Sequence, residues 1–277
     1  LVFAFGFLSK YAMAYLFMSM ILLLIFFEGV QNKFLNLKGF FSLISFFILI
    51  LPHLYWNFDN GFVTFSHTAD NANLKNINLN INEIFLFILS QFIVFGILPF
   101  YYVTSKIVDM KKFNKEKKIL YIFFLTPLII VTIIALFSRA NANWAVVGYP
   151  FGCILLAKLF QKKKYFKEKV LVISSQILLS LIVMLIVIVG QNNFRLDPFA
   201  KQRHAEVLAK YIKNELMSIN NSAFMADDRE DFALMLFYLK DFKGKRAKWN
   251  GDIKIDDHYE LTTNVNELIG HNLLFLT

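Results

Sequence analysis

A run of polar and aromatic side chains, PHLYWNFDNGFVTFSHTADNAN, occupies residues 52–73 between two strongly apolar segments. His67 and Asp70 are three residues apart in this run, so on a helix they would share one face. A His–Asp pair can orient a group that carries a proton, and the Asn57 amide can donate and accept hydrogen bonds. We predict a polar pocket here, facing water at a membrane surface. The plainer alternative is an amphipathic connector with solvated polar side chains.

Two cations lie near apolar segments elsewhere in the chain. Lys10, in the sequence LSKY, could hold a lipid phosphate at the headgroup level, or it could extend along the interface as lysines commonly do. Arg139 begins the turn RANANW, and its planar fork suits a phosphate or a sugar better than an ammonium does. Asn141 and Asn143 suit sugar hydroxyls, and Trp144 could stack on a sugar ring. The alternative is a loop arginine beside an interfacial tryptophan.

The composition indicates a membrane protein. Of the 277 residues, 57% are hydrophobic and 33 are Phe, a load that soluble domains rarely carry. The net charge of +9 does not indicate nucleic-acid binding, because the lysines crowd into short loops beside apolar segments. Cys153 is the one cysteine, so no disulfide forms within the chain, and we expect it to be a packing residue.

Apolar segments long enough to cross a bilayer recur along the first two thirds of the chain. A crossing helix needs about 20 apolar residues. We expect Pro52 to end the second crossing, residues 57–61 to form a turn, and residues 62–73 to form a short helix in the membrane plane. Six full spans and the tail of an earlier one at 1–9 are predicted, at about 11–27, 39–55, 84–103, 119–138, 145–160 and 170–190.

The lysines predict the orientation of these spans. Two loops, 104–118 and 161–169, are rich in lysine and should be cytoplasmic by the positive-inside rule. They are separated by two spans, so the two assignments agree. Counting outward places the loop 28–38 on the same side. Lys10, the segment 56–83, the turn 139–144 and everything after residue 190 then fall on the far side.

Residues 191–277 differ in kind from the rest. Residues 200–217 have helical spacing, strands are expected at 223–226, 246–249 and 273–276, and Asp231 is a candidate cap for a helix that ends at Leu239. The charged run 227–231 fits a solvated corner between strand and helix. The predicted fold is therefore mainly α: a polytopic bundle over 1–190, followed by a small α/β domain over 191–277. At this size the second domain would be marginal alone, so we expect it to rest on the membrane domain.

The segments LSKYA, PHLYWNFDNGFVTFSHTADNAN, RANANWAVVGYP and ADDREDFALMLFYL together resemble bacterial membrane glycosyltransferases of the protein-mannosyltransferase type. This group (glycosyltransferase families 39 and 83) includes the aminoarabinose transferase of lipid A. The resemblance covers nearly the whole chain in order and corresponds to the C-terminal part of such an enzyme. It implies the GT-C architecture and transfer of a sugar from a polyprenyl phosphate carrier on the periplasmic face.

The resemblance also implies that the catalytic acidic residue lies in a first outer loop near the N-terminus. This chain starts at Leu1 without such a loop, so we expect the catalytic base outside it, and the end at Thr277 is also expected to be a truncation. On chemistry and topology, Lys10 and Arg139 are our candidates for the carrier phosphate. The candidates for the sugar or acceptor pocket are Asn57, His67, Asp70, Asn141, Asn143 and Trp144.

The predicted function is transfer of a sugar from a polyprenyl-phosphate donor to a lipid acceptor of the lipid A or lipopolysaccharide kind, or to a protein. The predicted location is the bacterial inner membrane, with a periplasmic C-terminal domain. The expected partners are this donor, the acceptor and membrane lipids, without nucleic acid. No cofactor is evident; such enzymes can use a divalent cation, but the sequence shows no metal-ligand spacing. Two alternatives remain: a transporter or flippase of lipid-linked sugars, and an inactive fragment of the transferase.

Overall fold

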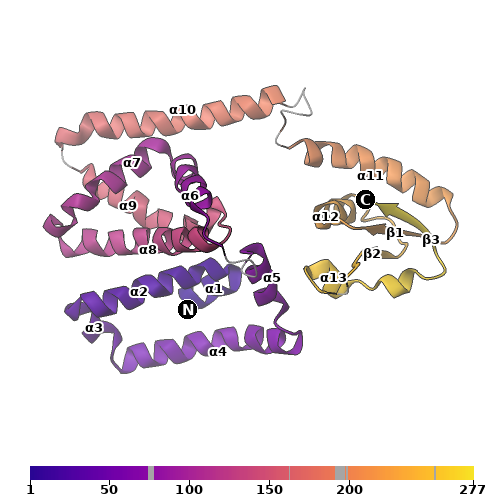
Figure 1. The fold of residues 1–277 in the computed structure, drawn as a ribbon, viewed down its shortest axis with the longest axis horizontal. Helices are drawn as coiled ribbons and strands as arrows, with labels where there is room; N and C mark the ends of the chain where they lie inside the picture. The colour runs from indigo at the N-terminus through magenta and orange to yellow at the C-terminus, as the bar shows by residue number, and fades with distance from the viewer. Residues whose placement is uncertain (74–77, 162, 191–196, 198, 253) are drawn as a thin grey trace. The chain divides into compact units, whose positions relative to one another are not determined.

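The computed structural model describes residues 1–73, 78–161, 163–190, 197, 199–252 and 254–277. The chain divides into two compact units, residues Leu1–Ser180 and Leu181–Thr277 (Figure 1). The predicted domain boundary at residue 191 lies outside the described residues.

The first unit is built from helices, as predicted. Four helices are long and apolar enough to cross a membrane, and the number rises to six if two bent helix pairs each count as one span. The long helices follow the predicted spans. The elements of this unit are α1 (Val2–Ser9), η1 (Tyr11–Met13), α2 (Ala14–Phe26), α3 (Glu28–Phe34), α4 (Leu37–Asp59), α5 (Val63–Asn71), α6 (Ile81–Val94), α7 (Ile97–Ser105), η2 (Lys106–Lys112), α8 (Lys115–Phe137), η3 (Ala142–Gly148), α9 (Tyr149–Leu159), η4 (Lys163–Tyr165) and the larger part of α10 (Phe166–Gly190).

Two predicted spans are bent rather than straight. The segment predicted at 84–103 breaks between α6 and α7 with a bend of 111°, and the one at 11–27 continues into α3 with a bend of 118°. The first break has a clear cause. Gly96 has φ +101°, a conformation that glycine alone adopts readily, and in a continuous helix Pro99 would clash with the Phe95 carbonyl four residues earlier.

Helix α4 corrects two predictions about the polar run. Pro52 was expected to end the span and residues 57–61 to form a turn, yet α4 continues through Pro52 to Asp59. A proline removes one helical hydrogen bond, a loss that membrane helices tolerate. The chain turns only after Asp59, with Gly61 and Phe62 at positive φ, and then forms α5. The short helix predicted within 62–73 is confirmed.

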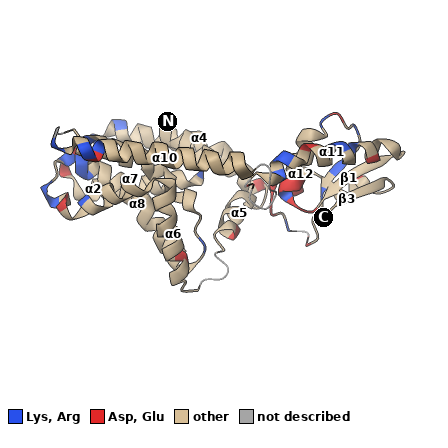
Figure 2. Cartoon of the chain, turned by 90° about the horizontal axis from the view of Figure 1, so that it is seen from above, with Lys and Arg blue, Asp and Glu red and all other residues tan. Residues whose placement is uncertain are grey.

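The two loops predicted to be lysine-rich and the loop predicted on the same side, 28–38, lie at one end of the first unit. Lys158, at the end of α9, forms a 2.6 Å ion pair with Glu116, at the start of α8. Lys115 Nζ lies 6.0 Å from the ring centroid of Phe27, which connects α2 to α3. We call segments 28–38, 104–118 and 158–169 the lysine-rich end; Figure 2 shows its basic residues gathered together. The cytoplasmic location of this end stays a prediction.

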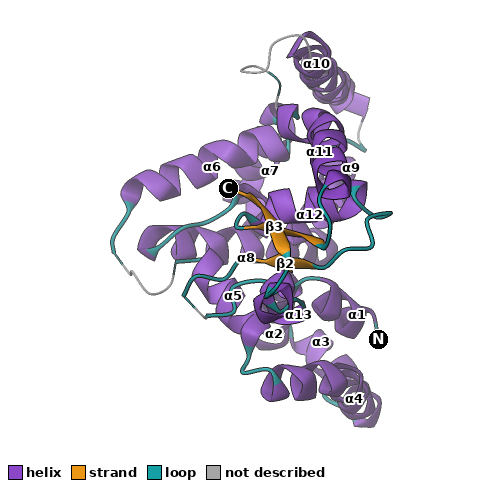
Figure 3. Ribbon diagram, turned by 90° about the vertical axis from the view of Figure 1, so that its right-hand side faces the viewer, coloured by secondary structure: helices purple, strands orange, loops and turns teal. Residues whose placement is uncertain are grey.

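The second unit contains a three-stranded parallel sheet in the order β2-β1-β3. Alternate residues of β1 face opposite layers: Phe224 and Ala226 pack with α11 and α12, while Ala223 and Met225 pack with Leu268 of η5. Figure 3 shows the strands among these helices. The elements are β1 (Ser222–Ala226), β2 (Arg246–Lys248), β3 (Asn272–Leu276), α11 (Ala200–Ser218), α12 (Arg229–Tyr238), α13 (His258–Thr262) and η5 (Val265–Leu268).

The predicted helix cap in this unit is wrong. Asp228, rather than Asp231, caps α12, because its Oδ1 accepts hydrogen bonds from the backbone N–H groups of Glu230 and Asp231. The backbone bond from Asp231 is the largest cause that lowers the pKa of Asp228. Lys201 of α11 contacts the carboxylates of Asp228 and Asp231 at 3.2 and 2.9 Å, and the hydrogen bond to Asp231 is the main cause that raises its pKa. The charged run thus joins α11 to α12.

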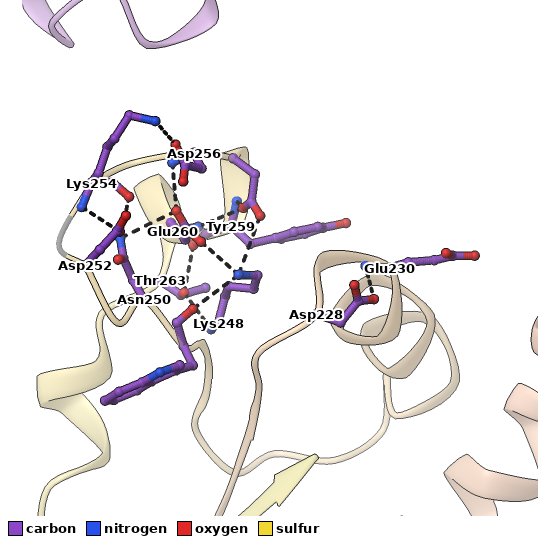
Figure 4. A network of polar contacts seen from close by, with 12 residues as sticks. Asp228, Glu230, Lys248, Asn250, Asp252, Lys254, Asp256, Tyr259, Glu260 and Thr263 are labelled. Carbon is purple, nitrogen blue, oxygen red and sulfur yellow. Dashed lines mark hydrogen bonds and ion pairs between the residues drawn. The ribbon is translucent and has the colours of Figure 1, made fainter. Parts of the chain in front are cut away.

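A buried ion pair follows β2 (Figure 4). Lys248 Nζ donates to Glu260 Oε1 at 2.8 Å and to the Trp249 carbonyl at 3.2 Å. The side chains of Lys248 and Glu260 are each 7% exposed, so the pair holds α13 to the sheet without facing solvent. Such a pair, satisfied by further hydrogen bonds, has a structural role.

Candidate functional site

A chain of hydrogen bonds joins three segments at the end of the first unit opposite the lysine-rich end. Tyr11 Oη of η1 lies 2.6 Å from His53 Nε2 of α4 and 2.6 Å from Thr64 Oγ1 of α5. Thr64 Oγ1 donates in turn to Asn57 Oδ1. Asn57 is fully buried, and its Nδ2 donates to the His53 carbonyl at 3.0 Å. The polar run therefore folds back on itself and on η1.

The donors in this chain follow from counting protons. The Thr64 hydroxyl donates its one hydrogen to Asn57, so Tyr11 must be the donor in its bond with Thr64. His53 Nε2 must then carry a hydrogen and donate to Tyr11. His53 Nδ1 is left as an acceptor; Asn57 Nδ2 lies 3.5 Å from it and 3.2 Å from Nε2. The hydrogen bonds through the two hydroxyls thus run from His53 through Tyr11 and Thr64 to Asn57 Oδ1.

The polar run also contacts the turn after α8. The Ser138 hydroxyl donates to the carbonyls of Ala72 and Asn73, and the backbone N–H of Arg139 donates to the Ala72 carbonyl at 3.4 Å. Ser138 is buried, so these bonds form away from water. The end of α5 is thereby fixed beside the turn that contains Arg139. We call residues 10–11, 53–73 and 138–149 the polar end.

A second buried network holds the turn at residues 139–144 to the neighbouring helices. Tyr149 Oη donates to Gln91 Oε1, and Gln91 Nε2 donates to the Ala142 carbonyl at 3.2 Å. Gln91 is 1% exposed and lies in α6, whereas Ala142 begins η3. Since η1 also lies against η3, residues near Lys10 and the turn are neighbours. The two networks thus hold α4, α5, α6, η1 and η3 together.

The predicted site residues all lie at this polar end, but they differ in exposure. Lys10, Arg139 and Asn143 are exposed, and Asn141 and Asp70 are half-buried. Half-buried His67 has its Nε2 2.9 Å from Asn71 Nδ2 within α5. Trp144 packs partly against the core of the helical unit. Asn57 has no exposed surface, so here it supports the other residues from behind rather than facing a pocket.

The site residues selected from the sequence do not include Tyr11, His53, Thr64, Ser138 or Gln91. One signal was available: His53 and Asn57 are four residues apart, and on a helix they share a face. That signal was hidden by the expectation that Pro52 ends the span. The bonds of Tyr11 and Gln91 join residues more than 40 positions apart, so no local pattern contains them.

Within the described residues, no group of three or more His, Cys, Asp or Glu side chains could hold a metal ion. The polar end supplies cations, amides and hydroxyls. Those groups suit binding of a phosphate and of sugar hydroxyls by hydrogen bonding and charge.

Comparison with known proteins gives one partial relationship. Over 119 residues, the chain is 28% identical to the lipid A galacturonosyltransferase RgtD of Rhizobium johnstonii. The match covers 42% of this chain and 25% of that enzyme's length. No protein-family model and no solved structure matches. Together with the apolar helices, this distant match supports a membrane glycosyltransferase.

Proposed function

We propose that this chain is part of a GT-C membrane glycosyltransferase that takes a sugar from a polyprenyl phosphate and passes it to a lipid or protein acceptor. The observation that carries the proposal is the partial match to a lipid A galacturonosyltransferase in a chain with several membrane-spanning helices. The chain spans about a quarter of that relative, so the activity belongs to the whole protein.

The polar end supports a division of roles within the proposal. When the sugar leaves its carrier, negative charge grows on the departing phosphate, and a fixed cation stabilises it. Exposed Arg139, whose backbone is held by Ala72, and exposed Lys10 are our candidates for this contact. His67, Asp70, Asn141, Asn143 and Trp144 line the sugar or acceptor pocket. Asn57 holds α4 to α5 behind it.

The proposed orientation follows from the lysines. The lysine-rich end faces the cytoplasm by the positive-inside rule, so the polar end faces the periplasm. The protein is then a multi-pass protein of the bacterial inner membrane. The catalytic base that deprotonates the acceptor is supplied by a part of the protein outside this chain, as the resemblance implies.

One observation favours the alternative of a flippase for lipid-linked sugars. Transporters often bind their cargo at broken helices, and α6 breaks from α7 at Gly96. However, no Asp, Glu, Lys, Arg or His residue among those described in residues 1–180 is buried as a whole. Ion-coupled transport pathways usually contain ionisable groups. We therefore favour transfer.

Proteoliposomes that contain the full-length protein distinguish the two functions. The relative's name gives a galacturonosyl group and lipid A, so the first test uses labelled galacturonic acid on the proposed carrier, polyprenyl phosphate, with a lipid A extract as acceptor. We expect label in the acceptor and release of the unloaded carrier. Movement of intact donor across the bilayer without transfer would establish the flippase. Neither product with any of a panel of lipid-linked sugars would overturn both.

A further inference from the structure

The lysine-rich end contains a cavity that the proposed function does not use. Its volume is about 540 Å³, within the range of sites for small ligands. The walls come from four parts of the chain: α7 with η2, the start of α8, the end of α9, and the segment that leads into α10. The cavity therefore lies where several membrane helices end.

The charges in this cavity are unevenly matched. Four lysines (Lys106, Lys112, Lys117 and Lys158) face two carboxylates (Asp109 and Glu168). Lys112 pairs with Asp109 at 3.3 Å, and Lys158 pairs with Glu116 outside the cavity. Lys106 and Lys117 are half-buried, unlike ordinary solvated surface lysines. Two partly shielded ammonium groups remain for an anion.

Aromatic rings form part of the same wall. The ring of Tyr102 meets that of Phe160 edge-on at 5.4 Å, and Lys117 Nζ lies 5.5 Å from the centroid of Phe113. Aromatic side chains at the ends of membrane helices mark the headgroup level of a bilayer. The lining by Tyr102 and Tyr165 therefore favours a cavity at the level of lipid headgroups.

Glu168 supplies an independent sign of a ligand. Its Oε2 is shielded from solvent and has no hydrogen-bond partner among the described residues. A buried carboxylate oxygen without a donor is costly, and a hydroxyl brought by a ligand would satisfy it. The cavity therefore suits a molecule that has both a phosphate, for the lysines, and a hydroxyl that donates to Glu168.

We propose that this cavity binds the headgroup of an anionic glycerophospholipid of the phosphatidylglycerol type. Lys106 and Lys117 contact the phosphodiester, and a headgroup hydroxyl donates to Glu168. Basic pockets between membrane helices hold anionic headgroups in this way. The site lies at the opposite end of the first unit from the proposed transferase site, so its occupancy is measurable without any sugar donor.

Native mass spectrometry of the full-length protein tests the proposal. The protein is released from micelles that contain equal amounts of phosphatidylglycerol and phosphatidylcholine. We expect retained phosphatidylglycerol to fall about thirtyfold in the Lys106→Gln/Lys117→Gln variant. Each lysine near the membrane surface strengthens the binding of an anionic lipid by a factor of roughly five to six, and the two factors multiply. The matched control, Lys111→Gln/Lys118→Gln, removes the same charge from the same end without touching the cavity. It should retain the lipid like the unmodified protein.

Two further variants protect the test against misfolding. Lys106→Arg/Lys117→Arg keeps both charges and should retain the lipid. Glu168→Gln removes the anionic acceptor and should reduce the preference for phosphatidylglycerol over phosphatidate, which lacks the headgroup hydroxyls. Equal retention by the Gln pair and its control would overturn the proposal. Displacement of the lipid by an equal concentration of glycerol phosphate would also overturn it, because the ligand would then be a soluble phosphate.

Discussion

At the scale of single residues, the polar end depends on side chains that satisfy one another's hydrogen-bonding groups. Asn57 has no contact with solvent, yet it joins the carbonyl of His53 to the hydroxyl of Thr64. Thr64 passes the connection to Tyr11, and Tyr11 stacks on Phe65 with ring centroids 5.1 Å apart. These contacts fix α5 relative to α4 before any ligand binds, which is the preorganisation that a transferase site requires.

We expect Asn57→Leu to destabilise the protein by about 1–3 kcal/mol, because it leaves the Thr64 hydroxyl without its acceptor in a buried place. Thermal unfolding of the purified full-length protein measures the change. Asn60→Leu is the control, since among the described side-chain contacts the Asn60 amide bonds only to the carbonyl of Trp56, in the helix that Asn60 follows. Equal melting temperatures for the two variants would show that the Asn57 network contributes nothing.

Arg139 is the residue on which the carrier-phosphate assignment depends most. Arg139→Ala should lower sugar transfer by about ten- to a hundredfold, the effect of losing one charge-assisted hydrogen bond. Arg139→Lys keeps the charge but loses the planar guanidinium, so its transfer rate should lie between those of the unmodified protein and Arg139→Ala. The rate is measured in membranes with equal amounts of inserted protein. Lys111→Ala, at the other end, is the control. Unchanged transfer in Arg139→Ala would remove this residue from the site.

At the scale of elements, the break between α6 and α7 shapes the first unit. Gly96 adopts φ +101°, and a Cβ on it would lie 2.2 Å from Gln176 Nε2 of α10. Phe95, next to the break, packs against Phe124 and Tyr149 in the middle of the bundle. The break therefore lies inside the packed core.

Gly96→Ala should cost about 1–3 kcal/mol of stability from the backbone alone. The clash with Gln176 adds to this, but that side chain is flexible at its end. The double variant Gly96→Ala/Gln176→Ala should recover the steric part and keep the backbone part. Melting curves of the three proteins separate the two costs. An unaltered melting temperature in Gly96→Ala would mean that the helix is not broken at this residue.

The sequence predicts most elements because they depend on local patterns. Runs of apolar residues indicate the spans, and the strands expected at 223–226, 246–249 and 273–276 agree with β1, β2 and β3 to within one residue at each end. The errors fall where a local rule is overridden. Pro52 does not end α4, because a membrane helix tolerates one lost hydrogen bond. Gly96 and Pro99 together do break a helix that hydropathy alone presents as continuous.

The candidate site is less accessible to sequence reasoning. Its exposed cations and amides stand out because they interrupt apolar segments. The residues that hold these groups in place do not stand out. Tyr11 and His53 are hydrogen-bonded although they are 42 positions apart in the sequence, and Ser138 and Ala72 are 66 positions apart. Only the fold brings such residues together. The prediction that Asn57 lines a pocket illustrates this limit, because burial in the folded protein decides whether a polar residue faces a ligand or a neighbour.

At the scale of the whole molecule, the two ends of the first unit have opposite chemical characters. The lysine-rich end carries cations in three loops, and the polar end carries hydrogen-bonding groups. The positive-inside rule predicts that the bilayer separates them, with the lysines in the cytoplasm. Sugar transfer would then take place on the outer face.

Labelling of introduced cysteines tests this orientation. In a Cys153→Ser background, Asp59→Cys places a thiol at the exposed end of α4, and Lys111→Cys places one in exposed η2. A membrane-impermeant maleimide added to intact spheroplasts should label the first variant and not the second. Permeabilised cells, in which both should react, provide the control. The reverse pattern would place the polar end in the cytoplasm and exclude periplasmic transfer.

The most direct measurement of the central claim is the mass of the envelope lipids in a strain that lacks the full-length protein. If the protein transfers a sugar to a lipid acceptor, a lipid in the deletion strain should be lighter by one sugar residue. The unmodified gene should restore the heavier species, and the gene with Arg139→Ala should restore little of it. Protein acceptors are checked in the same cells by intact-mass analysis of envelope proteins. Lipids and proteins of identical mass in the parent, deleted and restored strains would contradict the account.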